Sequence, residues 1–389
     1  MSDKTIILVL NAGSSSIKFT LYRGPQVLVD GQISGLGATP HIKFRSATTG
    51  ATVDRDLTAE EGANHDTALK SVLPLLEEEL GGSRVEAVGH RVVHGGVTFA
   101  APLRVTEAVF SDLETLIPLA PLHQPHNLTG IRAAESAFPG AVQVACFDTA
   151  FHRNHPWVND TFGLPRRYYE EGVRRYGFHG LSYEYICEHL KQTDPKTYSG
   201  KLVVGHLGNG ASMCAINNGQ SIGSTMGFTA LDGLPMGTRS GQLDPGVILY
   251  LLTTKGMSAD AISDLLYKQS GLKGLSGISQ DMRTLSESSD PRAREAIDYF
   301  VFRIRREIGG LAAVLGGLDT VVFTGGIGEH SALVRDQACR DMDWLGLKIE
   351  PDKNSRSETD ISAQDSRVKV LVIPTNEEEM IRQHTLAQL

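Results

Sequence analysis

Three short loops rich in glycine and hydroxyl residues are the first features of this sequence that could do chemistry. They span residues 11–16, 206–210 and 325–329, and each follows an apolar run. Successive backbone N–H groups in such loops can hold a phosphate, because glycine lets the chain approach closely and adopt positive φ. One such loop alone is more often only a tight turn. Three in one chain favour a phosphate-binding protein.

The two familiar phosphate-binding patterns do not describe these loops. No G-x-x-x-x-G-K-[ST] pattern occurs, and the best G-x-G-x-x-G candidate begins at Gly326 but has Ser331 in the place of its third glycine. A helix expected after it and Glu350, about twenty residues further on, keep a dinucleotide site as an alternative.

The segment GHRVVHGG, residues 89–96, is expected to be a strand that runs into a glycine turn. A period of two would put Arg91 and Val93 on one face, and a guanidinium beside a small apolar side chain suits a short carboxylate. The alternative is a surface strand with a solvated arginine. His123 and His179 each follow an apolar residue, although a lone histidine is usually structural.

Three further charged residues stand where chemistry or structure could explain them. Asp148 follows an apolar strand, where sheet ends commonly present active-site carboxylates, or it caps a turn. Arg239 lies in a glycine-rich loop beside hydroxyls, where phosphoryl transfer would need a second arginine, unless it is merely solvated. Glu377, in the run TNEEE, could belong to a helix cap with acidic first-turn residues.

The elements that must position these residues show an internal repeat. Residues 6–22 are expected to form a hairpin of two apolar strands around the first glycine loop, and residues 201–216 repeat that design. Aligning Leu10 with Leu207 sets Gly13 on Gly210 and Ser15 on Ser212. Half the chain separates the copies, so a duplicated two-domain architecture is predicted.

Helices and strands are expected to alternate between and after these hairpins, which makes the class α/β with mixed sheets. Apolar residues at 297, 300, 301, 304, 308, 311 and 315 recur at helical spacing and are assigned to the core. Strands are expected at residues 87–94, 141–147, 320–323 and 368–373. Helices are expected at 66–80, 107–117 and 128–137, from 331, and after 376.

Composition limits the partners. The chain has 389 residues, of which 41 are glycine, and its net charge of −8 does not favour a nucleic-acid or anionic-membrane surface. No apolar run is long enough for a signal peptide or a membrane span. Its four cysteines lie far apart without a C-x-x-C, as expected for buried thiols in a reducing cytoplasm.

Seven motifs in order along the chain resemble those of the acetate kinase family. They are NAGSSSIK (11–18), HRVVHGG (90–96), FDTAFH (147–152), YGFHG (176–180), HLGNG (206–210), MGTRSG (236–241) and PTNEE (374–378). The resemblance implies a duplicated two-domain actin-like (ribonuclease H-like) ATPase fold with mixed sheets and an interdomain cleft. It implies an N-terminal domain of residues 1–149 plus 376–389, and a nucleotide-binding domain of residues 150–375.

The implied reaction is reversible, direct in-line phosphoryl transfer between ATP and acetate, giving acetyl phosphate and ADP. By resemblance, Arg91 binds the carboxylate or acyl phosphate, and Arg239 and His179 stabilise charge on the transferring group. Asp148 orients the reacting groups or the metal, and is the acid/base proposed for the family. A carboxylate nucleophile is already deprotonated, so no general base is needed. Residues implied for the acyl site are Val93, Leu122, His123 and Phe178.

The resemblance also implies ligands for the metal and the nucleotide. Asn11 and Glu377 would hold Mg²⁺, or Mn²⁺, which keeps several of its waters. Nucleotide-binding residues would be Lys18, His206, Leu207, Gly208, Asn209, Gly210, Asp281, Met282, Arg283, Gly326, Ile327, Gly328, Glu329 and His330.

This chain departs from the family's pattern at a few positions. Ala230 stands where a proline is usual, which could leave room for another methylene and makes a propionate kinase the nearest alternative. Gln124 and His330 each replace a usual asparagine. A nucleotide-gated ATPase module is a second alternative, against which Arg91 and Arg239 argue. The family is typically a homodimer.

Overall fold

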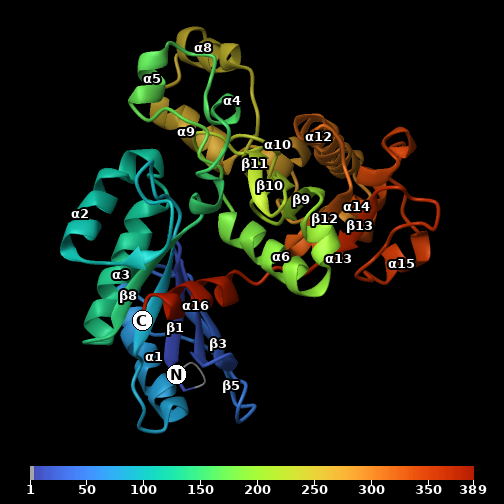
Figure 1. Ribbon diagram of the computed structural model, residues 1–389. Coiled ribbons are helices and arrows are strands. Elements are labelled where there is room, and N and C mark those ends of the chain that lie inside the picture. The colour runs from blue at the N-terminus through green and yellow to red at the C-terminus, as the bar shows by residue number, and fades with distance from the viewer. Residues whose placement is uncertain (1–3) are drawn as a thin grey trace. The chain divides into compact units, whose positions relative to one another are not determined.

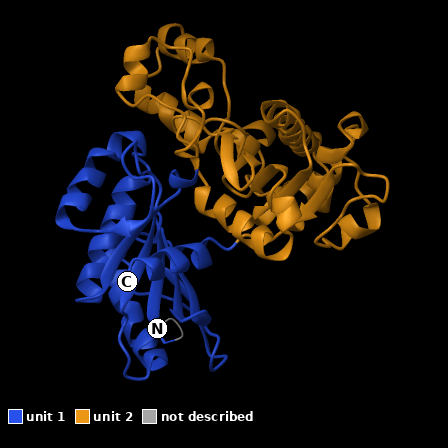
Figure 2. Cartoon of the chain, in the orientation of Figure 1, with its two compact units in different colours: residues 1–151, 376–389 blue, residues 152–375 orange. Residues whose placement is uncertain are grey.

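The protein divides into two compact units in a computed structural model that describes residues 4–389 (Figure 2). Unit 1 contains the chain up to Phe151 together with Asn376–Leu389, and unit 2 contains His152–Thr375. The chain therefore crosses between the units twice, after Phe151 and after Thr375.

Unit 1 is built on a mixed sheet of eight strands in the order β5-β4-β3-β2-β1-β6-β8-β7 (Figure 1). The first five strands form an antiparallel meander, whereas β1, β6 and β8 run parallel to one another. The strands are β1 (Ile6–Ala12), β2 (Ser16–Arg23), β3 (Gln26–Ser34), β4 (His41–Ser46), β5 (Thr52–Asp56), β6 (Ala87–Val92), β7 (Leu103–Arg104) and β8 (Val142–Phe147).

Helices pack on this sheet because its central strands β1, β6 and β8 are buried on both faces. Leu8 and Leu10 of β1 share a buried cluster with Leu69 and Val72 of α1. On β6, a side chain at Gly89 would lie 2.2 Å from Thr385 of α16, so glycine is needed for that helix to approach. The helices are α1 (His65–Leu80), α2 (Glu107–Thr115), α3 (Gln124–Ala137) and α16 (Glu377–Ala387), with short 3₁₀ turns at Ile117–Leu119 and Ala150–His152.

Unit 2 repeats the central topology of unit 1. Its five strands have the order β11-β10-β9-β12-β13, in which β9 to β11 are antiparallel neighbours and β9, β12 and β13 are parallel. This matches β3-β2-β1-β6-β8 strand for strand, as the repeated hairpin predicts. The strands are β9 (Lys201–Leu207), β10 (Ala211–Asn217), β11 (Gln220–Ser224), β12 (Thr320–Thr324) and β13 (Lys369–Val372).

The longest helix of the described chain, α12 (Pro291–Leu315), packs on β9 to β11 through the stripe predicted for it. Asp290 caps its first turn and Pro291 begins it, which is a favourable start for a helix. The other helices are α4 (Trp157–Asp160), α5 (Arg166–Glu170), α6 (Gly180–Thr193), α7 (Pro195–Tyr198), α8 (Pro245–Thr253), α9 (Ala259–Lys268), α10 (Gly271–Ser276), α11 (Met282–Glu287), α13 (Gly325–His330), α14 (Ala332–Cys339) and α15 (Pro351–Ser355), with a 3₁₀ turn at Asp343–Leu345.

Two local predictions were wrong. The third glycine loop is not a loop, because Gly325–His330 forms helix α13, and only Gly325 in it has positive φ, at 76°. A side chain there would lie 2.9 Å from the Leu207 carbonyl oxygen, so the close approach to β9 requires glycine. Strand β6 ends at Val92, so the alternation expected to put Arg91 and Val93 on one face does not reach Val93.

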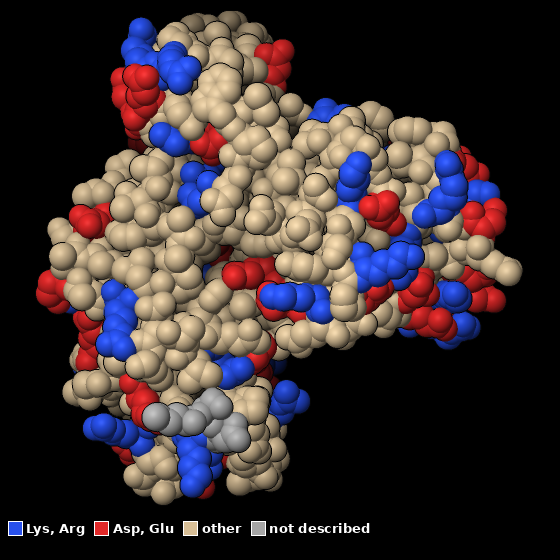
Figure 3. Space-filling view, viewed as in Figure 1, with Lys and Arg blue, Asp and Glu red and all other residues tan. Residues whose placement is uncertain are grey.

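The surface of the described residues mixes both signs of charge. On the face drawn in Figure 3, lysines and arginines stand among aspartates and glutamates, and no extended basic patch gathers there. Across residues 4–389, no helix is both long enough and apolar enough to cross a bilayer.

Candidate active site

The parallel strands of unit 1 bring three of the expected site residues to one edge of its sheet. Asn11 lies near the end of β1, Arg91 near the end of β6, and Asp148 directly follows β8. Because β6 pairs with both β1 and β8, these carboxyl ends are neighbours. The Asp148 amide donates to the Val92 carbonyl at 3.1 Å, which fixes the turn that carries the aspartate.

Arg91 and Asp148 form a bidentate ion pair. Arg91 Nε lies 3.0 Å from Asp148 Oδ1, and Nη2 lies 2.6 Å from Oδ2. The Asp148 side chain is only 2% exposed, whereas that of Arg91 is 21% exposed. Two parallel charge-assisted bonds hold the plane of the guanidinium, so Asp148 orients Arg91.

Two more side-chain oxygens approach the same guanidinium. Arg91 Nη1 is 3.5 Å from Asn11 Oδ1, and Arg91 Nε is 3.6 Å from Glu377 Oε2 in the first turn of α16. Burial alone would lower the pKa of Arg91, but Asp148 and then Glu377 raise it above its usual value. Arg91 is therefore a permanent cation in this cluster.

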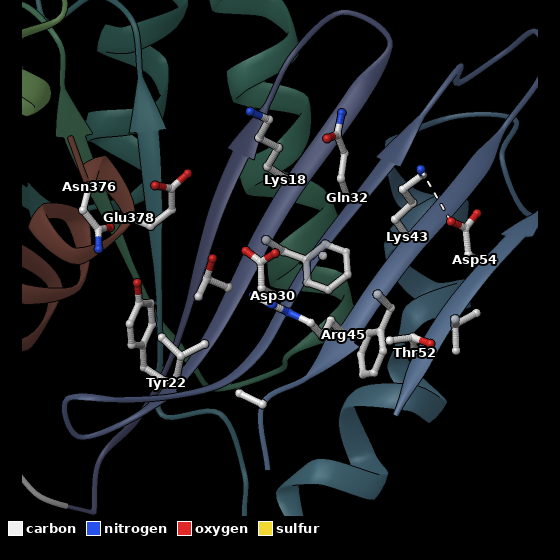
Figure 4. A pocket seen from close by; sticks show the side chains of 17 residues that line it. Lys18, Tyr22, Asp30, Gln32, Lys43, Arg45, Thr52, Asp54, Asn376 and Glu378 are labelled. Carbon is white, nitrogen blue, oxygen red and sulfur yellow. Dashed lines mark ion pairs between the residues drawn. The ribbon is translucent and has the colours of Figure 1, made fainter. Parts of the chain in front are cut away.

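Next to this cluster, one face of strands β2 to β5 and the start of α16 enclose a cavity of about 830 Å³ (Figure 4). Lys18 lines it from β2, while Asn376 and Glu378 line it from the other side. Burial, and then the neighbouring Glu377 carboxylate, raise the pKa of Glu378, whereas Lys18 and Arg91 act in the opposite direction. Lys18 is thus placed in unit 1, beside the acidic start of α16.

Two buried amides of α3 hold the segment that follows β6. Asn127 accepts from the Val93 amide at 3.0 Å and donates to the Ala12 carbonyl at 2.8 Å, which ties Val93 to the end of β1. Gln124 accepts from the His94 amide and donates to its carbonyl. Sequence reasoning missed Asn127 and treated Gln124 only as a departure from the pattern. Their helical spacing of three residues was the signal that they share a face.

The other expected acyl residues are divided between the units. Leu122 is 37% exposed and His123 precedes α3, both in unit 1. Phe178 is buried in unit 2 and precedes His179.

In unit 2, two histidines and an arginine meet at the second glycine loop. A side chain at Gly210 would lie 3.1 Å from His179 Nε2 and 3.7 Å from Arg239 Nη2. One at Gly208 would lie 3.8 Å from His206 Nε2. The rings of His179 and His206 are stacked, with centroids 4.3 Å apart. Polar side chains thus surround the backbone of a glycine loop, an arrangement that suits an anion site.

The backbone of His179 is itself unusual. Its φ is 59°, a left-handed conformation that is uncommon for residues other than glycine, and it precedes the first turn of α6. The fully buried His152 holds the preceding carbonyl, since its Nε2 lies 3.0 Å from Phe178 O, while its Nδ1 lies 2.8 Å from Ser221 Oγ. Burial lowers the pKa of His152 to about 4, so it serves this position as a neutral ring.

Hydroxyl groups bind the Nδ1 atoms of both site histidines. Ser212 Oγ lies 2.8 Å from His179 Nδ1 and 2.5 Å from Tyr183 Oη. Ser182 Oγ lies 2.8 Å from His206 Nδ1 and 2.8 Å from Thr375 Oγ1. Sequence reasoning assigned none of these four hydroxyls a role. The repeat did align Ser212 with Ser15 of the first phosphate loop, which was a usable signal.

A cavity of about 610 Å³ in unit 2 collects many of the expected nucleotide-binding residues. Its volume is that of a small-ligand site. Asp281 caps α11 and pairs with Arg283, which lowers the pKa of the Asp281 carboxyl. The expected residues that line the cavity are Gly208, Asn209, Asp281, Met282, Arg283, Gly326, Ile327 and His330.

The remaining expected nucleotide residues of unit 2 have structural partners. Leu207 and Gly328 are buried where α13 meets β9. Glu329 Oε1 accepts from the amides of Gly325 at 2.8 Å and Thr375 at 3.1 Å. Its carboxylate thus closes the turn of α13 and holds the last residue of unit 2.

The predicted metal site has few protein ligands. Among the described residues, no group of three or more His, Cys, Asp or Glu side chains is placed to hold a metal ion. Asn11 and Glu377 nevertheless supply two hard oxygen donors around Arg91. Such a sparse set fits Mg²⁺, which retains waters and takes further ligands from a substrate phosphate, better than it fits a metal caged by protein.

This fold and site define a class of protein, the phosphotransferases with a duplicated α/β fold. Comparison with known sequences gives the family. The sequence model of the Acetokinase family matches residues 6–383. Acetate kinases of Methylocella silvestris and Rhodopseudomonas palustris are 54% and 52% identical, over 98% and 99% of this chain and 98% of each relative. The chain belongs to the acetokinase family.

Solved structures with the same fold include proteins named acetate kinase and a protein named propionate kinase. Acetate kinase of Porphyromonas gingivalis superposes with a TM-score of 0.88 at 38% identity, over 98% of this chain and 99% of that one. A propionate kinase of Francisella tularensis superposes with a TM-score of 0.93 at 36% identity, over 99% and 100% of the two chains. These similarities bear out the predicted two-domain fold.

Proposed function

We propose that the protein catalyses reversible phosphoryl transfer between ATP and acetate, giving acetyl phosphate and ADP. The observation that carries the proposal is the Arg91–Asp148 pair, a permanently charged guanidinium held in one orientation at the carboxyl edge of a sheet. A fixed arginine is the group that recognises a small carboxylate. The relatives named acetate kinase in this family support the same choice.

Direct transfer asks the protein for positioning and for neutralisation of charge. In this proposal Arg91 binds the carboxylate of acetate or the acyl phosphate. Arg239 and His179, at the glycine loop of unit 2, stabilise charge on the transferring phosphoryl group. Asp148 orients Arg91, and its buried bidentate contact supports that role over proton abstraction. No base is needed because carboxylate oxygen is already the nucleophile.

Magnesium would be held by Asn11 and Glu377 in this proposal. When bound, the ion would neutralise phosphate oxygens of the nucleotide. Removing the negative charge of this ligand by Glu377→Gln should raise the Mg²⁺ concentration needed for half-maximal rate, and Mn²⁺ should substitute for Mg²⁺. The nucleotide itself would occupy the cavity of unit 2 between α11 and α13, whose lining supports this assignment.

Propionate is the second acyl group that an observation favours. The acyl residues are Val93, Leu122, His123 and Phe178, and Ala230 brings a smaller side chain than the usual proline. Ala230 also accepts a hydrogen bond from Arg239 Nη1 at 2.9 Å through its carbonyl, so the position touches the reaction machinery. One methylene changes binding in such a pocket by about 1–3 kcal/mol, which makes both acids accessible.

A homodimer is the proposed assembly. Helix α8 has the sequence PGVILYLLT, and none of its residues is buried in one copy of the chain. Val247, Leu249, Tyr250 and Leu252 leave more apolar surface exposed than a helix of a monomeric enzyme normally does. Sedimentation should give a dimer, and Leu249→Asp should shift it toward monomer. The burial of all four cysteines supports a reducing, cytoplasmic location.

The decisive experiment mixes purified protein with ATP, Mg²⁺ and acetate, and traps acyl phosphate with hydroxylamine. Parallel reactions with propionate and butyrate compare kcat/KM along the series. A larger kcat/KM for propionate than for acetate would mean that propionate is the preferred substrate. ATP hydrolysis with no acyl phosphate from any short acid would instead identify a nucleotide-gated ATPase module.

A further inference from the structure

We propose that Tyr183 and Ser212 are positioning residues that fix the proton of neutral His179 on Nε2. The imidazole then presents an N–H donor, and not a lone pair, to the glycine loop at residues 208–210. The inference rests on the proposed function only for the identity of the anion that this donor meets.

The three side chains form one buried chain of contacts within unit 2. Ser212 Oγ on β10 lies 2.8 Å from His179 Nδ1 and 2.5 Å from Tyr183 Oη on α6. Ser212 and Tyr183 are fully buried, and His179 is 8% exposed. Bulk water is therefore excluded from these contacts, and the order of donors and acceptors is set by the protein.

Proton counting decides between three arrangements. In one, Tyr183 donates to Ser212, and Ser212 donates to Nδ1 of His179. In the second, Nδ1 carries the proton and donates to Ser212, which donates to the tyrosine oxygen. In the third, Ser212 accepts from both, which would leave its own buried O–H without an acceptor among the described residues and is therefore disfavoured. A phenol, with a pKa near 10, is a far stronger donor than an aliphatic hydroxyl, and its oxygen is the weaker acceptor. The first arrangement is favoured, and an imidazole that accepts at Nδ1 has its proton on Nε2.

The position of Nε2 explains why this tautomer matters for anion binding at the glycine loop. A side chain at Gly210 would lie 3.1 Å from His179 Nε2, so this nitrogen reaches the backbone of the loop where Arg239 Nη2 also arrives. An N–H at Nε2 stabilises an anion there, whereas a lone pair would repel it. Losing one preorganised donor of this kind typically costs about 10²–10³ in kcat.

The second histidine of the site provides an internal comparison. His206 Nδ1 also meets a hydroxyl, Ser182 Oγ, but that hydroxyl continues to Thr375 Oγ1 and not to a phenol. Two aliphatic hydroxyls give no preferred direction of donation. Ser182 and Tyr183 both lie in the first turn of α6, so one helix start supplies groups for both imidazoles. Only His179 has a tautomer set by a stronger donor.

The direct test is the nitrogen resonances of His179 in protein labelled with ¹⁵N-histidine, assigned by their loss in His179→Gln. Wild-type protein at neutral pH should show a protonated Nε2 and an unprotonated Nδ1. Tyr183→Phe keeps the ring but removes the donor, so a share of His179 should move to the Nδ1–H tautomer. Tyr185→Phe, on the same helix but outside this chain of contacts, is the matched control and should leave the resonances unchanged.

Kinetics supplies the second measurement. Tyr183→Phe should lower kcat roughly tenfold and Ser212→Ala by a similar or larger factor, with KM for acetate and ATP within about twofold. Ser212→Cys, which restores a weak donor, should recover part of kcat. Tyr183→Phe removes a single oxygen, so it remains informative if Ser212→Ala fails to fold.

A proton on Nδ1 in the wild-type protein would overturn the inference, as would a Tyr183→Phe variant with unchanged resonances and unchanged kcat. Failure of the proposed function looks different. In that case no acyl phosphate forms, while the Nε2–H tautomer and its dependence on Tyr183 are still observed.

Discussion

Arg91 on β6 and Asp148, which directly follows the neighbouring parallel strand β8, share two hydrogen bonds of 3.0 and 2.6 Å. Because both Nε and Nη2 are taken by the aspartate, the guanidinium can turn neither about its long axis nor out of plane. Its Nη1 atom points to Asn11 Oδ1 at 3.5 Å, at the end of the first phosphate-loop strand. These contacts fix the position of Arg91, which is expected to bind the acyl group, relative to Asn11, which is expected to bind the metal.

Replacing Asp148 by asparagine tests whether Asp148 orients Arg91. The amide offers one acceptor and one competing donor, so the bidentate contact is lost while the shape is kept. We expect kcat/KM for acetate to fall by about a hundredfold or more, because Arg91 loses its orientation and its counter-charge together. Steady-state rates at varied acetate measure the effect.

A second bidentate pair in the same unit is the control for that change. Arg132 and Glu107 form two bonds of 2.7 Å, but their side chains are 41% and 80% exposed. Glu107→Gln should leave kcat/KM unchanged, because this pair is exposed and screened by solvent. An Asp148→Asn enzyme as active as the Glu107→Gln enzyme would remove Asp148 from the site.

Gly210→Ala probes the crowded glycine loop. The added methyl would lie 3.1 Å from His179 Nε2, so the imidazole must shift by a few tenths of an ångström. Misplacing a donor to the phosphoryl group should lower kcat by roughly tenfold or more, while folding is little affected because a side chain can yield. Gly310→Ala in α12, where a methyl meets no atom within 4 Å, should keep full activity. Equal rates in both variants would contradict the placement of His179.

Sequence patterns predicted the elements that depend on local periodicity. The stripe from Ile297 to Leu315 and the two hairpins all formed where expected, because apolar spacing and turn chemistry are local signals. The start of α13 was missed, since the glycines of Gly325–His330 suggested a loop. Their helical conformation depends on Glu329 and on close contact with Leu207, which are tertiary interactions.

The residues of the candidate site also divide into those that sequence patterns indicate and those that they do not. Charged residues such as Arg91, Asp148 and Arg239 stand out from sequence, because they lie in or directly after apolar strands or among glycines. The supporting hydroxyls and amides do not stand out, since serine, tyrosine and asparagine are common everywhere. Ser212, Tyr183 and Asn127 acquire roles only when strands and helices remote in sequence come together.

Gly326→Ala tests the cavity assigned to the nucleotide. Gly326 lines the cavity, and a side chain there would meet no protein atom within 4 Å, so folding should tolerate it. The methyl takes space from a ligand, and KM for ATP should rise roughly tenfold while KM for acetate stays constant. Unchanged KM for ATP, with an unchanged melting temperature, would place the nucleotide elsewhere.

The stability of unit 1 should depend on pH through His90. This side chain is buried and bonded to Gln143 Oε1 at 2.7 Å, and burial lowers its pKa to about 4. An unfolded histidine has a pKa of about 6.5, so between pH 6.5 and 4 the unfolded chain takes up a proton that the folded chain refuses. The free energy of unfolding should therefore fall as the pH falls through this range, by about 3 kcal/mol in total.

Urea unfolding of wild-type protein and His90→Gln, followed by circular dichroism between about pH 6.5 and 4.5, measures this contribution. The variant should lose up to about 1.4 kcal/mol per pH unit from the slope, because one fewer proton is bound on unfolding. His41 provides the opposite case: it is bonded to Asp56 and Asp54, which raise its pKa, so acidification favours its folded state. His41→Gln should consequently make the slope no shallower. Identical slopes for wild type and His90→Gln would mean that folding does not change the pKa of His90, which its burial argues against.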